Sequence, residues 1–325
     1  MAEWLIEQGI GEERALLIDS GLAIAARIHW PGGLTAGQVE DAILISRAKG
    51  SLRGTARFAN GEEALVDRLP KGAQEGAALR LEITRSAFSE KIRIKRAQAR
   101  PTDLAPRPAP NLAEMLRHEN GQAARIVRHF PGDDWDELWA KAWTGISDFS
   151  GGSLHFSATP AMVLVDVDGA LAPRELALAA APALAQAIRQ MDLAGSIGID
   201  FPTLGPKADR RVLDDALDAA LAGWPHERTA MNGFGFVQLV SRLKHPSMLH
   251  RITQSRAGAA ARHLLRRAEK INDPGAILLT MHPAVKAGMK ADWLSELARR
   301  TGREIRQASD PSLALDGGFA QAVQL

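Results

Sequence analysis

The sequence predicts a protein of the α/β class, α+β when the whole chain is counted, with a β-rich N-terminal region, a central α/β domain and a small C-terminal α/β unit. Before residue 100, short β-branched or alternating segments are separated by glycine turns. Beyond residue 111, apolar runs alternate with segments of helical periodicity, as in an α/β layer. Between them, prolines oppose both helix and sheet and favour an extended linker. The predicted divisions are 1–100, a linker at 101–111, 112–250 and 251–325.

The N-terminal region is predicted to be an antiparallel β domain of small-barrel size, and an OB-type barrel is one candidate. Ser20-Gly21 and Asn60-Gly61 have the composition of tight turns between strands. The expected strands are 15–18, 22–28, 38–45, 51–58, 64–66 and 79–83.

Helical periodicity and apolar runs alternate through the rest of the chain. Trp135, Trp139 and Trp143 recur at every fourth position, a pattern typical of a helix face packed in the core rather than of a ligand site. The expected helices are 112–130, 133–146, 182–191, 208–221, 259–270 and 293–300. The expected strands are 162–169, 196–201, 234–239, 276–280 and 304–307.

The composition excludes several classes of protein. With 325 residues and 46% hydrophobic content, the chain has enough apolar material for two or three domains and is not predominantly disordered. It contains no cysteine, which excludes disulfides, thiolate zinc sites and cysteine nucleophiles and fits a reducing compartment. The first residues are acidic where a signal peptide is basic, and no apolar run reaches about 18 residues. We therefore expect a soluble, cytoplasmic protein.

Two apolar runs end in aspartates and form the most informative feature of the chain. Asp166 and Asp168 are two residues apart near the end of one predicted strand, so they point to the same side, and Asp200 ends the next strand. Carboxylates that converge repel one another unless a cation lies between them, and hard oxygen ligands favour Mg²⁺ or Mn²⁺. The sequence thus predicts a metal site made of all three. The alternative is that each aspartate ends a strand and caps a turn.

The segment 165–171 also resembles the first motif of the haloacid-dehalogenase phosphatases, in which the first aspartate is a covalent nucleophile and the second a general acid. It departs from that motif because Ala170 replaces the usual threonine and the segment lies in the middle of the chain. The paired acids downstream, Asp214 and Asp215, lie in a predicted helix rather than at a strand end.

Basic residues with two possible roles accompany the acidic motif. On one face of a predicted strand, Lys91, Arg93 and Lys95 could follow a phosphate backbone, or they could protect a sheet edge from pairing. The net charge is only +2, but the isoelectric point is about 9.0. No catalytic Ser, His and Asp set and no glycine loop with a phosphate-binding lysine can be assembled from the sequence. The other candidate phosphate ligands, placed around the acidic motif, are Arg210, Arg228, Arg242 and Lys244.

The order of motifs in the central region resembles the catalytic region of the ribonuclease E/G family. The likeness is closest over 147–249. The N-terminal β region is similar to a reduced version of the family's RNase H-like strands with an inserted OB-type RNA-binding barrel. The C-terminal unit is similar to the family's small domain. The motifs are Gly151-Gly152-Ser153-Leu154-His155-Phe156, Val165-Asp166-Val167-Asp168, Gly195-Ser196-Ile197-Gly198-Ile199-Asp200-Phe201, Asp209-Arg210-Arg211 and Glu227-Arg228-Thr229.

This resemblance implies a Mg²⁺-dependent endonuclease that cleaves single-stranded RNA and leaves a 5′-phosphate. Asp166 and Asp200 match the family's two metal ligands, and Asp168 stands where the family has asparagine, so it would position water or metal. Of the basic residues around the acidic motif, Arg228 and Arg242 would hold phosphate. A catalytically weak RNA-binding protein of the same fold is the alternative.

Three departures from the family pattern qualify the resemblance. The two cysteines of the family's zinc link are absent between Met248 and Ala259, which favours a monomer or dimer over a zinc-linked tetramer. The segment that senses an RNA 5′-monophosphate is shortened. Aromatic stacking residues are few in the predicted barrel, where Phe58 is the clearest candidate.

Overall fold

The computed structural model describes residues 2–90, 93–121 and 123–324 and contains helices and several sheets, as the predicted mixed class requires. A sheet near the N-terminus has the order β11-β1-β2-β3, with β11 parallel to β1. The region 1–100 therefore contains strands of three separate sheets, one of which is completed by a strand from beyond the linker. The strands of this N-terminal sheet are β1 (Glu3–Gln8), β2 (Glu13–Asp19), β3 (Leu22–His29) and β11 (Arg125–Val127).

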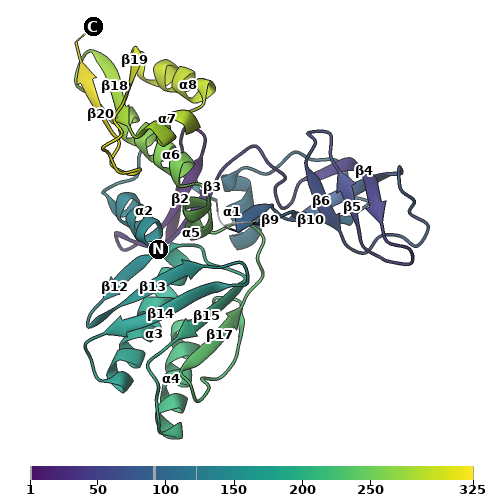
Figure 1. Cartoon of the computed structure of the whole chain (residues 1–325), viewed down its shortest axis with the longest axis vertical. Coiled ribbons are helices and arrows are strands. Elements are labelled where there is room, and N and C mark those ends of the chain that lie inside the picture. The colour runs from purple at the N-terminus through teal and green to yellow at the C-terminus, as the bar shows by residue number, and fades with distance from the viewer. Residues whose placement is uncertain (1, 91–92, 122, 325) are drawn as a thin grey trace.

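A closed five-stranded barrel projects to one side of the molecule (Figure 1). Its strands follow the order β10-β6-β5-β4-β7, and β10 closes the ring against β7. Only the pair β10 and β6 is parallel. Phe58, the predicted stacking residue, is 3% exposed in the barrel's core and so is not presented to a base. The barrel strands are β4 (Val39–Arg47), β5 (Gly54–Arg57), β6 (Glu63–Val66), β7 (Ala78–Arg85) and β10 (Ala97–Pro101).

Between β7 and β10, strands β8 (Phe88–Glu90) and β9 (Arg93–Lys95) form a separate two-stranded sheet. Helix α1 (Leu112–Asn120) follows the linker and is shorter than the helix predicted for 112–130. Asn111 and Glu114 form a capping box at its start, and Gly121 ends it in the left-handed conformation that glycine adopts readily. The chain beyond then pairs as β11 instead of continuing the helix.

The large sheet has the order β12-β13-β14-β15-β17-β16, and helices α3 (Pro173–Gln190) and α4 (Lys207–Ala220) pack on one face. Helix α3 begins at Pro173 rather than at Pro182, because a proline in the first turn lacks only an N–H that would have no partner there. The strands are β12 (Ile146–Phe149), β13 (Gly152–Ala158), β14 (Val163–Gly169), β15 (Ser196–Asp200), β16 (Glu227–Arg228) and β17 (Phe236–Val240).

The C-terminal unit is a three-stranded sheet of order β19-β18-β20 with helices packed against it. Within the described residues, no helix is long and apolar enough to cross a membrane. The elements of this part are α5 (Met248–Gln254), α6 (Arg256–Glu269), β18 (Ala276–Met281), α7 (Pro283–Gly288), α8 (Ala291–Thr301), β19 (Ile305–Ser309) and β20 (Phe319–Val323).

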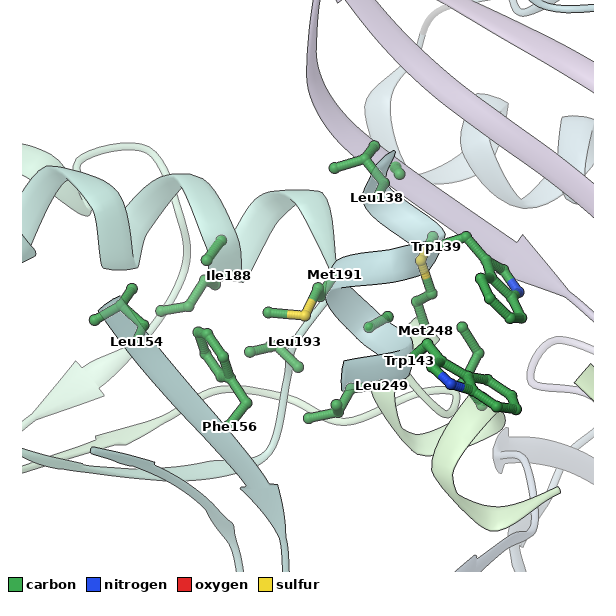
Figure 2. Close-up of a cluster of buried hydrophobic side chains, with 14 of the residues drawn as sticks. Leu138, Trp139, Trp143, Leu154, Phe156, Ile188, Met191, Leu193, Met248 and Leu249 are labelled. Carbon is green, nitrogen blue, oxygen red and sulfur yellow. The ribbon is translucent and has the colours of Figure 1, made fainter. Parts of the chain in front are cut away.

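One continuous hydrophobic core joins the N-terminal sheet, the large sheet and the C-terminal helices, whereas the barrel has a core of its own. Helix α2 (Asp134–Thr144) lies at the centre of the shared core, and its three tryptophans are at most 7% exposed, which confirms the predicted stripe. Figure 2 shows Trp139 and Trp143 beside Met248 of α5, with Met191 and Phe156 on the side of the large sheet.

Candidate metal centre and RNA interface

The three predicted aspartates all lie on the open face of the large sheet. In β14, Val163, Val165 and Val167 are buried toward the helices, and the residues that alternate with them are exposed. In β15, Ile199 is buried and the terminal Asp200 is exposed. The alternation follows from the two-residue period of a strand, which sends the valines to the core and the carboxylates to solvent.

The register of the two strands makes Asp166 and Asp200 direct neighbours. Strands β14 and β15 are parallel, and Asp166 is the partner of Asp200 at the carboxyl end of β15. Neighbouring strands lie roughly 4.8 Å apart, so two carboxylates that are in register on the same side of the sheet point into the same small volume of solvent. Asp168 extends beyond the end of β15, and its Oδ1 accepts a hydrogen bond of 2.8 Å from the backbone N–H of Gly169.

Among the described residues, no group of three or more His, Cys, Asp or Glu side chains is gathered closely enough to hold a metal ion. The three carboxylates therefore share one face without forming a closed set of ligands. Mg²⁺ is commonly bound through one or two carboxylates and keeps several waters. The pair of Asp166 and Asp200 matches that requirement in number and in its hard oxygen donors.

Two polar residues on β13 join this surface and were missed as site residues in the sequence reasoning. His155 is the register partner of Asp166, and Ser153 is the partner of Asp168. The Ser153 hydroxyl and His155 Nε2 are 2.8 Å apart and share a hydrogen bond. The alternation of Ser153 and His155 with buried Leu154 is the sequence signal that places both on the same face as the aspartates.

An apolar wall borders the carboxylate pair on the other side. Phe236 of β17 is the register partner of Asp200, and its ring lies over Gly198. A Cβ at Gly198 would come within 2.5 Å of that ring and 2.9 Å of the Met162 sulfur. Only glycine therefore permits these two side chains to close over β15 next to Asp200.

Two of the predicted phosphate ligands lie away from this surface and are held by the protein itself. Arg228 is the register partner of buried Leu239, on the helix-covered face, and it forms ion pairs with Asp214 at 2.7 Å and Asp218 at 2.8 Å. Arg210 on α4 donates to the carbonyl oxygens of the loop before that helix. Neither guanidinium faces the aspartates.

The other two lie beside a pocket of about 470 Å³ between the barrel, α1 and the segment after β17. Arg242 is exposed, whereas Lys244 Nζ forms an ion pair with Glu119 at 3.0 Å. Burial alone would raise the pKa of Glu119, but its ion pair with Arg27 outweighs burial and holds that pKa at about 2. Glu119 is therefore a permanent anion that partly neutralises this basic wall.

The basic strand predicted near residue 91 is seen only in part. Lys91 lies outside the described residues, and Arg93 belongs to β9. Lys95 Nζ donates to the carbonyl oxygen of Pro160 at 3.3 Å and lies 5.2 Å from the centre of the Phe88 ring. Lys95 thus connects the β8 and β9 hairpin to the loop that enters β14.

A comparison with models of known protein families finds no match to this chain, and a comparison with curated proteins finds none either. The candidate site is therefore defined by its own geometry.

Proposed function

We propose that this chain is a Mg²⁺-dependent endonuclease that cleaves single-stranded RNA, of a compact type similar to the ribonuclease E/G family. The observation that carries the proposal is the register of Asp166 with Asp200, which brings two exposed carboxylates together on one face of the sheet, where β15 ends beside its parallel neighbour β14.

The barrel supports RNA as the substrate class. Five strands closed in the order β10-β6-β5-β4-β7, with one parallel pair, match the arrangement of OB-type barrels, which bind oligonucleotides. The exposed Arg242 and the paired Lys244 provide positive charge beside the pocket between the barrel and α1, and Lys95 provides it beside the loop that enters β14. Such groups bind phosphates irrespective of base sequence.

The residues of the open face have distinct tasks in this proposal. A bound Mg²⁺ would lower the pKa of a water and offset negative charge as the phosphodiester reacts. Asp166 and Asp200 would hold the ion, and Asp168, oriented by the Gly169 N–H, would accept a hydrogen bond from the attacking water. His155 lies next to Asp166 and would fix the position of that water or of the scissile phosphate.

A cleavage assay with end-labelled single-stranded RNA and Mg²⁺ tests the proposal. Asp166→Asn should lower the rate at least about 100-fold, because the stabilisation supplied through a metal is worth several kcal/mol, and EDTA should abolish cleavage. Asp215→Asn, which changes an exposed aspartate on α4, should cleave like the wild type.

Two outcomes would replace the proposal. RNA binding without cleavage would identify a catalytically inactive RNA-binding protein. Release of phosphate from a small phosphomonoester, with RNA left intact, would favour the phosphatase chemistry that the segment 165–171 resembles.

A further inference from the structure

A second pocket, of about 340 Å³, lies where the end of β3, the start of β8, α5 and α6 meet, and the aspartate pair does not line it. Trp30, Ala87 and Phe88 line one part of it, and Arg251 and Arg262 line another. The proposed RNA cleavage site uses none of these residues.

The guanidinium group of Arg251 lies in the pocket wall. Its Nε is closed off from solvent and has no hydrogen-bond partner in the part of the chain that the structure describes. Across residues 2–90, 93–121 and 123–324, no ion pair joins Arg251 to a carboxylate; its side-chain contact is with the ring of Trp30, 5.6 Å from the centre. A buried N–H donor without a partner, such as Nε of Arg251, loses its hydration without gaining a hydrogen bond in return.

Arg262 adds a second uncompensated charge beside the first. It donates to the carbonyl oxygens of Gly11 and Gly258 at 2.8 and 3.0 Å, and its guanidinium lies between Trp30 and Trp293, 3.9 and 4.5 Å from the ring centres. Burial lowers the pKa of the Arg262 guanidinium to about 10. Burial and the positive charge of Arg262 together lower the pKa of the Arg251 guanidinium to about 10.

The acids that act electrostatically on these arginines are already paired with other groups. Asp192 acts on Arg251, but its carboxylate is paired with Arg27 at 3.1 Å. Glu12 acts on both arginines, but its two oxygens accept from Arg14 at 2.7 Å and from Trp30 Nε1 at 3.0 Å. By contrast, the buried Arg14 and Arg266 each form close ion pairs with carboxylates. These two fully buried arginines are paired, whereas the half-buried Arg251 and Arg262 line a cavity without a carboxylate partner among the described residues.

We propose that this pocket binds a phosphate-type oxyanion, which Arg251 and Arg262 hold against the aromatic wall of Trp30 and Phe88. An anion between two like charges replaces their repulsion with attraction and satisfies donors that are otherwise unused. Phosphate suits the site better than a monatomic ion because the guanidinium fork matches two oxygens at once. Inorganic phosphate and the phosphate of a nucleotide share this chemistry.

Isothermal titration of the full chain with inorganic phosphate, against chloride at equal ionic strength, tests the proposal. The wild type should bind phosphate, and Arg251→Met should bind it at least about tenfold more weakly, since the substitution removes the charge-assisted hydrogen bonds of one guanidinium. Arg211→Met, which removes an exposed arginine of α4, should bind phosphate like the wild type.

Ala87→Glu is a second, independent variant, because it places a carboxylate on the pocket wall beside the arginines. It should abolish phosphate binding and remove the phosphate-dependent rise in Tm that ligand linkage gives the wild type. Tighter binding of adenosine 5′-monophosphate than of phosphate, with none of adenosine, would identify a nucleotide, and equal binding of the first two would identify free phosphate. Absence of phosphate-specific binding by the wild type, or unchanged affinity in both variants, would overturn the proposal.

Discussion

Arg228 and Arg242 differ in what already holds them, although the sequence presents both as phosphate ligands. The Arg228 side chain is 12% exposed and is shared by Asp214 and Asp218. Arg242 is exposed at the edge of the larger pocket and, in the part of the chain that the structure describes, has no ion-pair partner. Arg228 therefore links β16 to α4 through ion pairs, whereas Arg242 remains available to the RNA of the proposed function.

This difference gives opposite expectations for two matched substitutions. Arg242→Met should weaken RNA binding and reduce the slope of log K against log salt by about 0.7, the value for one phosphate of a single strand. Arg228→Met should leave that slope unchanged and lower the free energy of unfolding by about 1–3 kcal/mol, because Asp214 loses its partner. Fluorescence anisotropy at several salt concentrations and urea denaturation measure the two quantities. A changed salt slope in Arg228→Met would place that side chain on the RNA instead.

The positions of the aspartates could be predicted from the sequence, but their pairing could not. Period-two alternation with the buried valines fixes the face on which Asp166 and Asp168 lie. Their alignment with Asp200 depends on the register of two strands joined through α3, which no local pattern encodes. For the same reason His155 looked isolated in the sequence, because its neighbour is created by the pairing of β13 with β14.

Among the elements, most of the predicted strands and helices lie close to their expected bounds, but strands β1, β10, β12 and β20 were not predicted. The six strands expected in the N-terminal region all exist, within a few residues of their predicted bounds. Helix α1 is shorter than predicted because apolar periodicity continues past Gly121 into β11, and α3 is longer because Pro182 is accommodated inside it. The pairing of β11 with β1 was not predictable, since β1 precedes the barrel strands in the sequence and β11 follows them.

One buried arginine of helix α6 forms ion pairs with both the N-terminal sheet and α2. Arg266 is 1% exposed and forms ion pairs with Glu7 of β1 at 3.1 Å and with Asp136 of α2 at 2.9 Å. Glu7 also contacts Arg14 at 3.1 Å, so two arginines share one buried carboxylate. This arrangement ties three elements that are distant in the sequence.

Arg266→Met should lower the free energy of unfolding by about 3–5 kcal/mol, because removing one partner of a buried ion pair leaves the other uncompensated. Arg299→Met, which removes an exposed arginine of α8 paired with Glu296, should leave the stability close to that of the wild type, because solvent screens an exposed ion pair. Urea denaturation of the three proteins measures both differences. Equal stability of Arg266→Met and the wild type would show that the buried network contributes no net stabilisation.

At the scale of the whole molecule, the fully buried ionisable side chains lie on elements that contribute to the shared core or adjoin it. Burial, followed by the positive charges of Arg251 and His245, lowers the pKa of His29 to about 4. Burial also lowers the pKa of His245. For Glu7, burial alone would raise the pKa, but Arg14 and Arg266 outweigh it and the pKa lies below its ordinary value.

These shifts predict that acid destabilises the protein in two stages. A histidine with a lowered folded pKa stays neutral while the unfolded chain takes up a proton below its ordinary pKa of about 6.5, so stability falls as the pH drops from about 6.5 to 4. Glu7 and Glu119 have lowered pKa values as well, and their contribution is lost below about pH 4.5, where unfolded carboxyls protonate first.

His29→Gln should flatten the first stage, because the substituted side chain takes up no proton in either state. From the shift of its pKa, His29 should account for about 3 kcal/mol of the loss between pH 6.5 and 4. Urea denaturation at half-unit steps of pH measures the slope, with His118→Gln on the exposed face of α1 as the control that should keep the wild-type slope. A slope in His29→Gln as steep as that of the wild type would mean that another group, and not the histidine buried at the end of β3, takes up the proton on unfolding.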